Sequence, residues 1–454
     1  MPQPTGSIPP LKDTHQKHSS IVTQMIQLIH MVQQIISTAI GKVVKRATAL
    51  RGGGSALPGL VVEKIDPKFL NRTLAQLPLG VVIISGTNGK TTTTKVVVEL
   101  LESAGLRVFT NRTGSNFSRG IASALLGEIN NRGKIDSDIA VLELDEAWAA
   151  KFVDSVKPSY SLILNVLRDQ LDRFGEIDST AKLLQKIADS TTIATILNKD
   201  DPRVQQLSKT TPADIHYFGT TDELLALMPT DDGSASGDNR ANNSIDADVL
   251  LQEINGSSTP TFLIDGQQIS QKLELNGVYN MLNAAAALCL VKKILSDNKV
   301  NHDNTQLVDW LSIIRPAFGR GETIELGGTP IELILVKNPS GFRLALMSFT
   351  EQKPTMIAIN DNYADGRDMS WLWDVDFTSL PGVDSVTGSR AYDMALRLQY
   401  DLVDVKSVNT DLVASLSEFI KLQPDSPKKI FCTYTAMTAI RRELSKITDV
   451  EKIS

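Results

Sequence analysis

Residues 84–95 read ISGTNGKTTTTK and constrain the fold more than any other feature, because they follow the continuous apolar run LGVVI. A buried strand, a glycine-bracketed Lys-Thr pair and a helix-competent run, in this order, are typical of phosphate-binding loops. The loop is a variant of the standard G-x-x-x-x-G-K-[ST] pattern, since Ile84 stands at the first glycine position and Gly86 lies inside the loop. An ordinary glycine turn is the structural alternative, but the order of these elements favours nucleotide binding.

Phosphate binding by such a loop depends on hydrogen-bond donors and on positive charge. Backbone N–H groups at a helix N-terminus donate to phosphate oxygens, and a lysine neutralises their charge. The residues predicted to bind the nucleotide are Gly86, Thr87, Asn88, Gly89, Lys90, Thr91 and Thr92. Thr91 is also a candidate Mg²⁺ ligand.

A carboxylate at a neighbouring strand end would complete the metal site. Glu143 lies in the strand-like stretch AVLELDEA, and a carboxylate at the end of a parallel strand commonly binds Mg²⁺. Asp145 and Glu146 lie nearer the start of the following helix, where acidic residues favour the helix dipole. Glu143 is therefore the predicted metal ligand, and the other two are expected to be mainly structural.

Apolar runs alternate with helix-competent stretches along the chain, which predicts an α/β fold with parallel sheets covered by helices on both faces. The first set of predicted strands is 80–85, 138–144, 160–166 and 191–198, with helices at 90–105 (closed by Gly105) and 277–295. The second set is 331–336, 355–360, 384–388 and 429–435, with a helix at 389–400.

This alternation of predicted strands and helices divides the chain into three parts. Residues 1–45 are predicted to form a tail and an amphipathic helical arm, 46–314 a central nucleotide-binding domain, and 315–454 a C-terminal α/β domain. Residues 220–260 are rich in Gly, Ser, Asn and Asp and are expected to be a flexible insertion in the central domain.

The helical arm is predicted from residues 19–41, which carry no Asp, Glu, Lys or Arg. Polar residues recur every three or four positions, opposite an apolar stripe of Val22, Met25, Ile26, Ile29, Val32, Ile36 and Ile40. This pattern indicates an amphipathic rather than a membrane-spanning helix. The stripe is expected to pack on the body of the protein, with contact to a membrane surface as the second alternative.

The net charge and the cysteine content exclude several classes of protein and of metal site. A formal net charge of −6 gives no basic field for nucleic acid. Two cysteines, Cys289 and Cys432, exclude a disulfide framework and a four-cysteine metal site, and a cytoplasmic location is expected.

A guanine-nucleotide reading has one supporting motif. Residues 198–201, NKDD, match the N-K-x-D pattern that selects guanine, but no strand end supplies a D-x-x-G switch. A guanine-nucleotide switch, or a non-catalytic scaffold, therefore stays an alternative of a different class.

Taken together, several stretches resemble the Mur ligase family. They are SGTNGKTTTTK, TNRTGSNFSRGIASALL, VLELDEA, LNVLRDQLDRFGE, LNKDDP, LNGVYNMLNAAAAL and FGRGE. More narrowly, the chain resembles the MurT-type subunits of lipid II isoglutaminyl synthase through RGGGSALPGLV, LVKNPSGF, INDNYADGRDMSWLWDVDF, GSRAYDMALRLQY and TYTAM. The resemblance runs from about residue 46 to 445.

The resemblance implies a ligase with the Mur-type fold that uses ATP and Mg²⁺ to amidate the α-carboxylate of D-glutamate in lipid II. An acyl phosphate would be the intermediate, and the work would take place in the cytoplasm or at the inner face of the membrane. Lys90, Thr91 and Glu143 carry over as phosphate and Mg²⁺ ligands. Asn280 or its neighbour Asn283 carries over to the nucleotide pocket, and Arg320 to the γ-phosphate. An amino-acid-adding ligase of the Mur or folylpolyglutamate type is the nearer alternative.

Three departures accompany the resemblance. Asp169-Gln170 replaces the Asp-His pair of amino-acid-adding Mur ligases, and Lys337-Asn338-Pro339 replaces their His-Asn-Pro motif; the MurT type shares both forms. Many MurT-type proteins also carry a four-cysteine zinc ribbon, which this chain cannot build from two cysteines.

Amidation needs ammonia, and the residues of the chain indicate in part where that ammonia comes from. Cys289 and Cys432 lie in apolar stretches without a histidine motif, so the chain is not expected to hydrolyse glutamine alone. The resemblance implies a GatD-type glutaminase partner and an aspartate that completes the partner's Cys-His pair. Asp365 and Asp368, in DNYADGRDMSWLWD, are both candidates, with a slight preference for Asp365.

Overall fold

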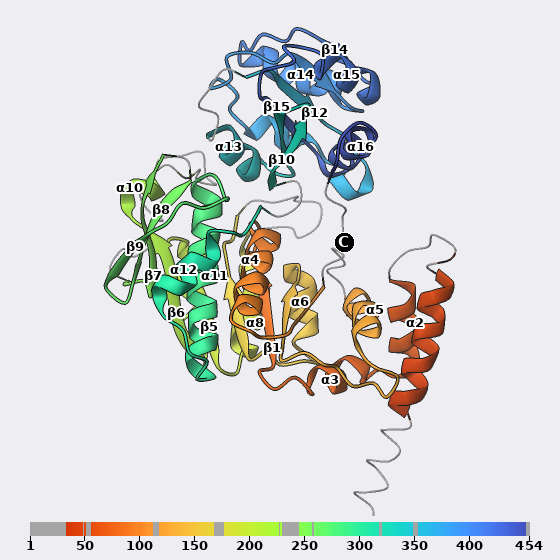
Figure 1. Cartoon of the computed structure of the whole chain (residues 1–454), viewed down its shortest axis with the longest axis vertical. Helices are drawn as coiled ribbons and strands as arrows, with labels where there is room; N and C mark the ends of the chain where they lie inside the picture. Colours follow the sequence, from red (N-terminus) through yellow and green to blue (C-terminus); the bar gives the residue numbers. More distant parts are fainter. Residues whose placement is uncertain are drawn as a thin grey trace, which may run out of the picture. The chain divides into compact units, whose positions relative to one another are not determined.

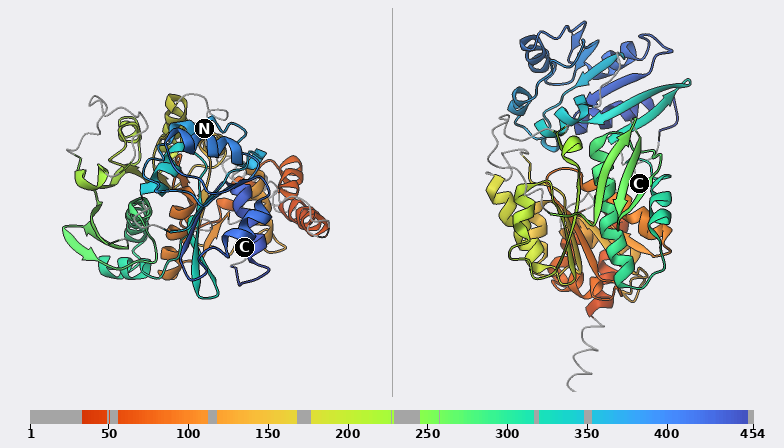
Figure 2. Two further views of the ribbon diagram at one scale, coloured as in Figure 1. Left: turned by 90° about the horizontal axis from the view of Figure 1, so that it is seen from above. Right: turned by 90° about the vertical axis from the view of Figure 1, so that its left-hand side faces the viewer.

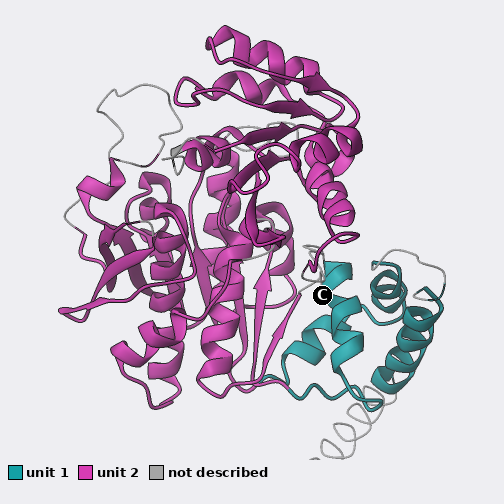
Figure 3. Ribbon diagram, turned by 45° about the horizontal axis from the view of Figure 1, so that its top comes forward, with its two compact units in different colours: residues 1–77, 113–136 teal, residues 78–112, 137–454 magenta. Residues whose placement is uncertain are grey.

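The computed structural model describes residues 33–48, 50, 56–111, 118–167, 177–226, 228, 245–256, 258–316, 320–347 and 353–450. The chain divides into two compact units, shown in teal and magenta in Figure 3. Unit 1 comprises Met1–Leu77 and Thr113–Asp136, and unit 2 comprises Pro78–Arg112 and Ser137–Ser454. The first domain boundary was expected at residue 45, but unit 1 extends to Leu77 and includes residues 113–136. The reason is that α2 and α3 pack against α5, which comes from the later segment.

Unit 1 is built from helices. They are a helix over residues 33–48, α2 (Leu57–Ile65), α3 (Phe69–Leu74) and α5 (Ser118–Glu128). Residues 1–32, and with them most of the predicted arm, lie outside the described residues.

The described part of the arm is oriented opposite to expectation. Ser37 and Thr38 are buried, whereas Ile36 and Ile40 of the predicted apolar stripe are exposed. The reason is close helix packing at Gly41, where an added Cβ would lie 2.5 Å from Val62 Cγ2. Only a face of small side chains allows such an approach, so for these residues the expectation that the stripe packs inward is wrong.

Unit 2 contains a nine-stranded sheet in the order β2-β3-β1-β4-β5-β6-β7-β8-β9, parallel from β2 to β7 and antiparallel from β7 to β9. The strands are β1 (Val81–Ser85), β2 (Val108–Thr110), β3 (Ile139–Glu143), β4 (Tyr160–Ile163), β5 (Ala194–Asn198), β6 (Asp214–Thr220), β7 (Val249–Asn255), β8 (Thr259–Ile264) and β9 (Gln267–Ser270). The apolar runs of β1, β4 and β5 are buried along their whole length, as strands covered on both faces must be.

Helices cover this sheet. They are α4 (Lys90–Ser103), α6 (Glu146–Phe152), α8 (Ile177–Ser190), α9 (Pro202–Leu207), α10 (Asp222–Leu225), α11 (Val278–Asp297) and α12 (Asn304–Leu311). α4, α11 and α12 pack on one another, and α6 packs on α8 (Figure 1). Among the described residues, one helix, α11, is long and apolar enough to cross a membrane, but 72% of its apolar window is buried inside the protein. That burial is the one expected of a core helix.

The expectation of a flexible insertion over 220–260 is wrong for its last part. β7 pairs with β6 and β8, so β7 and the first residues of β8 extend the sheet. Alternating side chains such as Val249 and Leu251 are buried in the core while their neighbours face outward, a pattern that the polar composition obscures. Residues 227 and 229–244 lie outside the described residues.

The second sheet of unit 2 has six strands in the order β10-β11-β15-β12-β13-β14, with only β10 and β11 antiparallel. Its strands are β10 (Arg320–Leu326), β11 (Thr329–Leu335), β12 (Thr355–Ala358), β13 (Ser385–Thr387), β14 (Val408–Asn409) and β15 (Lys428–Cys432). Its helices are α13 (Pro339–Met347), η1 (Tyr363–Asp365), η2 (Ser370–Asp374), α14 (Ala391–Tyr400), α15 (Leu412–Phe419) and α16 (Tyr434–Leu444), drawn in colours from teal to blue in Figure 2. Both sheets are of the α/β kind that the sequence predicts.

Candidate active site around the phosphate loop

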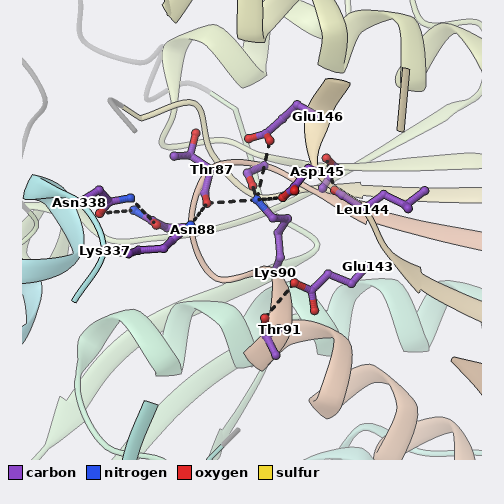
Figure 4. A network of polar contacts seen from close by, with 12 residues as sticks. Thr87, Asn88, Lys90, Thr91, Glu143, Leu144, Asp145, Glu146, Lys337 and Asn338 are labelled. Carbon is purple, nitrogen blue, oxygen red and sulfur yellow. Dashed lines mark hydrogen bonds and ion pairs between the residues drawn. The ribbon is translucent and has the colours of Figure 1, made fainter. Parts of the chain in front are cut away.

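The phosphate loop joins β1 to α4 at the carboxyl end of β1. β1 pairs with β3 on one side and β4 on the other, so the strand order reverses at this point. Ligands of open α/β sheets bind outside the carboxyl ends of the strands at such a reversal. The sheet therefore places the loop where a nucleotide is expected (Figure 4).

Two glycines allow the loop to pass close to its neighbours. Gly86 has a φ of +129°, and a Cβ there would lie 3.0 Å from the backbone N and O of Asn165. Gly89 has a φ of +89°, and its Cβ would lie 2.4 Å from Asn283 Oδ1. Asn283 is thus brought against the loop, whereas Asn280 donates its side-chain amide to Asn276 O at 2.8 Å.

Lys90 is almost fully buried and surrounded by acceptors. Its Nζ donates to Gly86 O at 2.5 Å and to Thr87 O at 3.2 Å. The same ammonium lies 3.5 Å from Asp145 Oδ1 and 3.8 Å from Glu146 Oε2. The two acidic residues expected to be mainly structural therefore also balance the charge of the loop lysine.

Thr91 and Glu143 meet as the sequence predicts. Thr91 Oγ1 donates to Glu143 Oε1 at 2.8 Å. Asn111, just after β2, holds the Glu143 backbone through two hydrogen bonds: its Nδ2 donates to Glu143 O and its Oδ1 accepts from Glu143 N. Sequence reasoning missed Asn111, although its position directly after a strand at the same sheet edge was an available signal.

A hydroxyl and a carboxylate are oxygen ligands of the type that Mg²⁺ prefers. Among the described residues, no three His, Cys, Asp or Glu side chains gather as a metal cluster. The pair Thr91 and Glu143 fits an ion that takes its other ligands from phosphate oxygens and water, which is how Mg²⁺ is usually bound at phosphate sites.

Asn165, after β4, is a further residue that sequence reasoning missed. Its Oδ1 accepts from Asn88 N at 2.9 Å, and its Nδ2 donates to Asn88 O at 3.1 Å and to Tyr279 Oη at 2.8 Å. Its backbone O also accepts from Thr87 N. Asn165 therefore fixes the conformation of the loop from the neighbouring strand.

The Lys337-Asn338-Pro339 motif also reaches the loop. Asn338 Nδ2 donates to Asn88 Oδ1 at 3.0 Å, while Asn338 Oδ1 accepts from Gly341 N at 2.8 Å at the start of α13. Lys337 Nζ lies 3.5 Å from Thr87 O. A side chain of the second sheet domain is thereby hydrogen-bonded to the phosphate loop of the first (Figure 4).

Other predicted residues are not brought to the loop by described contacts. Arg320 begins β10, opposite Ile334, and its side chain lies outside the described residues. Asp169 and Gln170 also lie outside them. Thr92, by contrast, follows the loop directly, and its side chain is buried in the first turn of α4.

The NKDD motif has structural roles. Asp201 Oδ1 accepts from Arg203 N and Val204 N and so caps α9, and Asp201 Oδ2 accepts from Val166 N at 2.7 Å. Burial raises the pKa of Asp201. Both oxygens of the carboxylate that would select guanine are therefore used within the chain.

The two candidate aspartates of the C-terminal domain differ sharply. Asp365 is buried; it accepts from Thr435 N at 2.7 Å, from Thr435 Oγ1 at 2.6 Å and from Asn362 N at 3.0 Å. Asp368 is exposed and accepts from Ser370 N at 2.9 Å. Hydrogen bonding to Ser370 lowers the pKa of Asp368, so it is an accessible carboxylate.

Neither cysteine is suited to nucleophilic chemistry. Cys289 and Cys432 are both buried, and burial raises the pKa of each thiol far above its usual range. A thiolate is the reactive form of cysteine, and burial in apolar surroundings suppresses it. These are the only cysteines of the chain.

An aromatic surface is formed by side chains of η2 and α14. We define it as Trp373, Tyr392, Leu396 and Tyr400, all exposed. The last three follow a spacing of four along α14, and Trp373 of η2 stands edge-on to Tyr400 at a centroid distance of 5.1 Å. Exposed Trp and Tyr side chains are enriched in protein–protein interfaces.

Comparison with known families agrees with this geometry. The family model described as "Mur ligase middle domain" matches residues 84–291, and the model described as "MurT ligase C-terminal" matches residues 335–437. A solved structure of MurF ligase from Thermotoga maritima in complex with ADP superposes with a TM-score of 0.62 at 17% identity, covering 86% of this chain and 83% of that one. Fold and loop thus define the class of the Mur ligases, which are ATP-dependent enzymes.

Sequence relatives narrow the class further. The MurT subunit of lipid II isoglutaminyl synthase (glutamine-hydrolyzing) from Streptococcus pneumoniae is 32% identical over 438 residues, covering 88% of this chain and 94% of the relative. The same subunit from Staphylococcus aureus is 30% identical over 407 residues, covering 82% and 89%. The chain belongs to the MurT family of Mur ligases.

Proposed function

We propose that the chain is the synthase subunit of a lipid II isoglutaminyl synthase. It uses ATP to amidate the α-carboxylate of D-glutamate in lipid II, with ammonia from a GatD-type glutaminase, during peptidoglycan synthesis. The single observation that carries this proposal is the phosphate loop with Lys90, Thr91 and Glu143 in a chain of the MurT family.

The proposed chemistry is phosphoryl transfer followed by amide formation. The γ-phosphoryl group of ATP passes to the carboxylate, and ammonia then attacks the acyl carbon and releases phosphate. Lys90 and the loop N–H groups bind the phosphates, and Arg320 is proposed to stabilise charge on the γ-phosphate in the transition state. Thr91 and Glu143 are proposed to hold Mg²⁺, which neutralises phosphate charge when bound.

The nucleotide pocket is proposed to include Asn283 and Asn280. Asn283 is the better supported, because it lies against Gly89 of the loop. Asn280 lies one helical turn earlier on α11, and its side-chain amide is hydrogen-bonded to Asn276 O.

A separate glutaminase is proposed as the ammonia source, because both thiols of this chain are buried and burial raises the pKa of each. The exposed Asp368 and the aromatic surface are the proposed docking region. An accessible carboxylate can orient and stabilise a partner's catalytic histidine, which is a known role of aspartate. Since ATP and the precursor side of lipid II are cytoplasmic, the complex is proposed to work at the inner face of the membrane.

The test is amidation of lipid II by the purified chain with its glutaminase partner, glutamine, ATP and Mg²⁺. Lys90→Ala should reduce product formation by about 10³-fold or more, as expected for loss of a preorganised group that stabilises phosphoryl transfer. Lys182→Ala is the matched control, because Lys182 is an exposed lysine of α8 in the same sheet domain, and it should retain full activity.

Two outcomes would overturn the proposal. Normal turnover by Lys90→Ala would remove the role of the phosphate loop. Incorporation of a labelled amino acid, with no amide nitrogen from glutamine or ammonium, would instead assign the chain to the amino-acid-adding ligases.

A further inference from the structure

The helix over residues 33–48 buries its small and polar face. Ser37, Thr38 and Gly41 point into unit 1, and a Cβ on Gly41 would come within 2.7 Å of Leu126 Cδ2 on α5. Lys42 Nζ donates to Ile129 O at 2.7 Å, and Lys45 Nζ to Ser123 O at 3.0 Å. These contacts fix which face of the helix looks outward.

The outward face is an apolar stripe. Ile36, Ile40 and Val43 are 50%, 37% and 65% exposed, and Leu50, at the end of this region, is 90% exposed. Their spacing of four and three residues keeps Ile36, Ile40 and Val43 on one side of the helix. We call this set the outer stripe: Ile36, Ile40 and Val43. Aliphatic side chains in such a row expose apolar area that water does not favour, which marks an interaction site.

The segment that carries the outer stripe is cationic in sequence. Residues 33–50 contain Lys42, Lys45 and Arg46 and no Asp or Glu. Arg46 is exposed, and the two lysines keep part of their surface accessible. Glu128 on α5 interacts electrostatically with Lys45, so the exposed Arg46 is the main source of positive charge beside the stripe. An anionic bilayer surface complements both the apolar row and this cationic flank.

We propose that the outer stripe is a membrane-docking surface that inserts shallowly into an anionic leaflet. This inference rests on the proposed function, in which the acceptor is lipid-linked and the enzyme must meet it at the bilayer surface. Docking would restrict the search for lipid II to two dimensions. The stripe takes no part in the chemistry, so it would act on access to the acceptor alone.

The test uses the full chain in complex with its glutaminase partner and sedimentation with vesicles. The vesicles contain phosphatidylglycerol and phosphatidylcholine, or phosphatidylcholine alone. The variant is Ile36→Gln/Ile40→Gln/Val43→Gln. The matched control, Val413→Gln/Leu422→Gln/Ile447→Gln, removes three exposed aliphatic side chains of the C-terminal domain.

The wild type and the control should bind anionic vesicles, and the outer-stripe variant should partition at least about tenfold less, because shallow insertion scales with buried apolar area. All three should amidate lipid II equally in detergent micelles, where docking is not required. That micelle assay separates the two ideas, since a wild type inactive in micelles would refute the proposed function and not the docking surface.

Three results would overturn the proposal. They are absence of vesicle binding by the wild type, equal binding by the outer-stripe variant, and loss of a wild-type dimer in that variant without any vesicle binding. The last result would assign the stripe to a second copy of the chain.

Discussion

Gly89 combines two constraints at a single position of the phosphate loop. Its φ of +89° is unfavourable for any residue with a Cβ, and Asn283 Oδ1 occupies the space in which that Cβ would lie. Gly105, which follows α4, has a similar φ of +85°, but a Cβ added there would have nothing within 4 Å. A comparison of substitutions at Gly89 and Gly105 therefore separates the cost of backbone strain from the cost of steric conflict.

Gly105→Ala should lower the free energy of unfolding by about 1–2 kcal/mol, the cost of the left-handed conformation alone. Gly89→Ala should lose about 1–3 kcal/mol more, because Asn283 must move from its packed position. Denaturant unfolding measures both losses. Protection by ATP against thermal unfolding should be lost in Gly89→Ala and retained in Gly105→Ala.

Gly89→Ala/Asn283→Ala supplies the internal check, since removing the Asn283 amide should return most of the additional loss. Equal destabilisation by Gly89→Ala and Gly105→Ala would contradict the proposed contact between Asn283 and the loop.

At the scale of elements, the segment from η1 to η2 separates a structural aspartate from an accessible one. Asp365 ends η1 and ties it to the first turn of α16 through Thr435. Asp368 lies between η1 and η2, outside both. The slight preference for Asp365 as the residue that serves the glutaminase stays untested, but the geometry favours Asp368.

Asp368→Asn should abolish glutamine-dependent amidation while leaving amidation with ammonium salts and the unfolding midpoint unchanged. Asp365→Asn should lower the free energy of unfolding by about 1–3 kcal/mol, because an amide cannot accept all of the hydrogen bonds that the carboxylate accepts. Steady-state assays with each nitrogen source, together with denaturant unfolding, measure these effects.

The opposite pattern would restore Asp365 to the catalytic role. It would consist of an Asp365→Asn variant of normal stability that uses ammonium but not glutamine, and an Asp368→Asn variant that uses both.

At the scale of the whole molecule, Asn88 and Asn338 connect the two sheet domains of unit 2. Asn88 belongs to the phosphate loop, and Asn338 stands immediately before α13 in the second domain. Asn338 is fully buried, so its amide has no water to replace a lost partner. We therefore expect a change at the phosphate loop to affect α13, in the domain that we propose binds the glutaminase.

Binding of a non-hydrolysable ATP analogue should slow amide hydrogen exchange in α13 of the wild type. Asn88→Ala should weaken that response by removing the loop side of the link without disturbing the α13 cap made by Asn338. Mass-spectrometric exchange, with and without the analogue, measures the effect, and α15 serves as a reference helix of the same domain that lacks this contact among the described residues.

Full retention of the α13 response in Asn88→Ala, at saturating analogue, would show that the two domains are not coupled through this pair.

The core of the fold could be read from the sequence where local patterns are strong. The runs that form β1, β4 and β5 are continuous apolar segments, and Lys90, Thr91 and Glu143 take their places from the ends of such strands. β7 was missed, because its alternating pattern lies at the end of a polar stretch. The match to the Mur ligase and MurT families agrees with the architecture that these runs predict.

The sequence by itself determined that β1, the phosphate loop and α4 follow one another, and with them the position of the loop, because periodicity and glycine placement act over short distances along the chain. The tertiary structure alone decided that Asn165 and Asn338 hold Asn88, that Asp145 and Glu146 face Lys90, and that the helix over 33–48 turns its aliphatic residues outward. Such contacts join residues far apart in the chain, and close packing at Gly41 outweighs local amphipathicity, so no local pattern contains them.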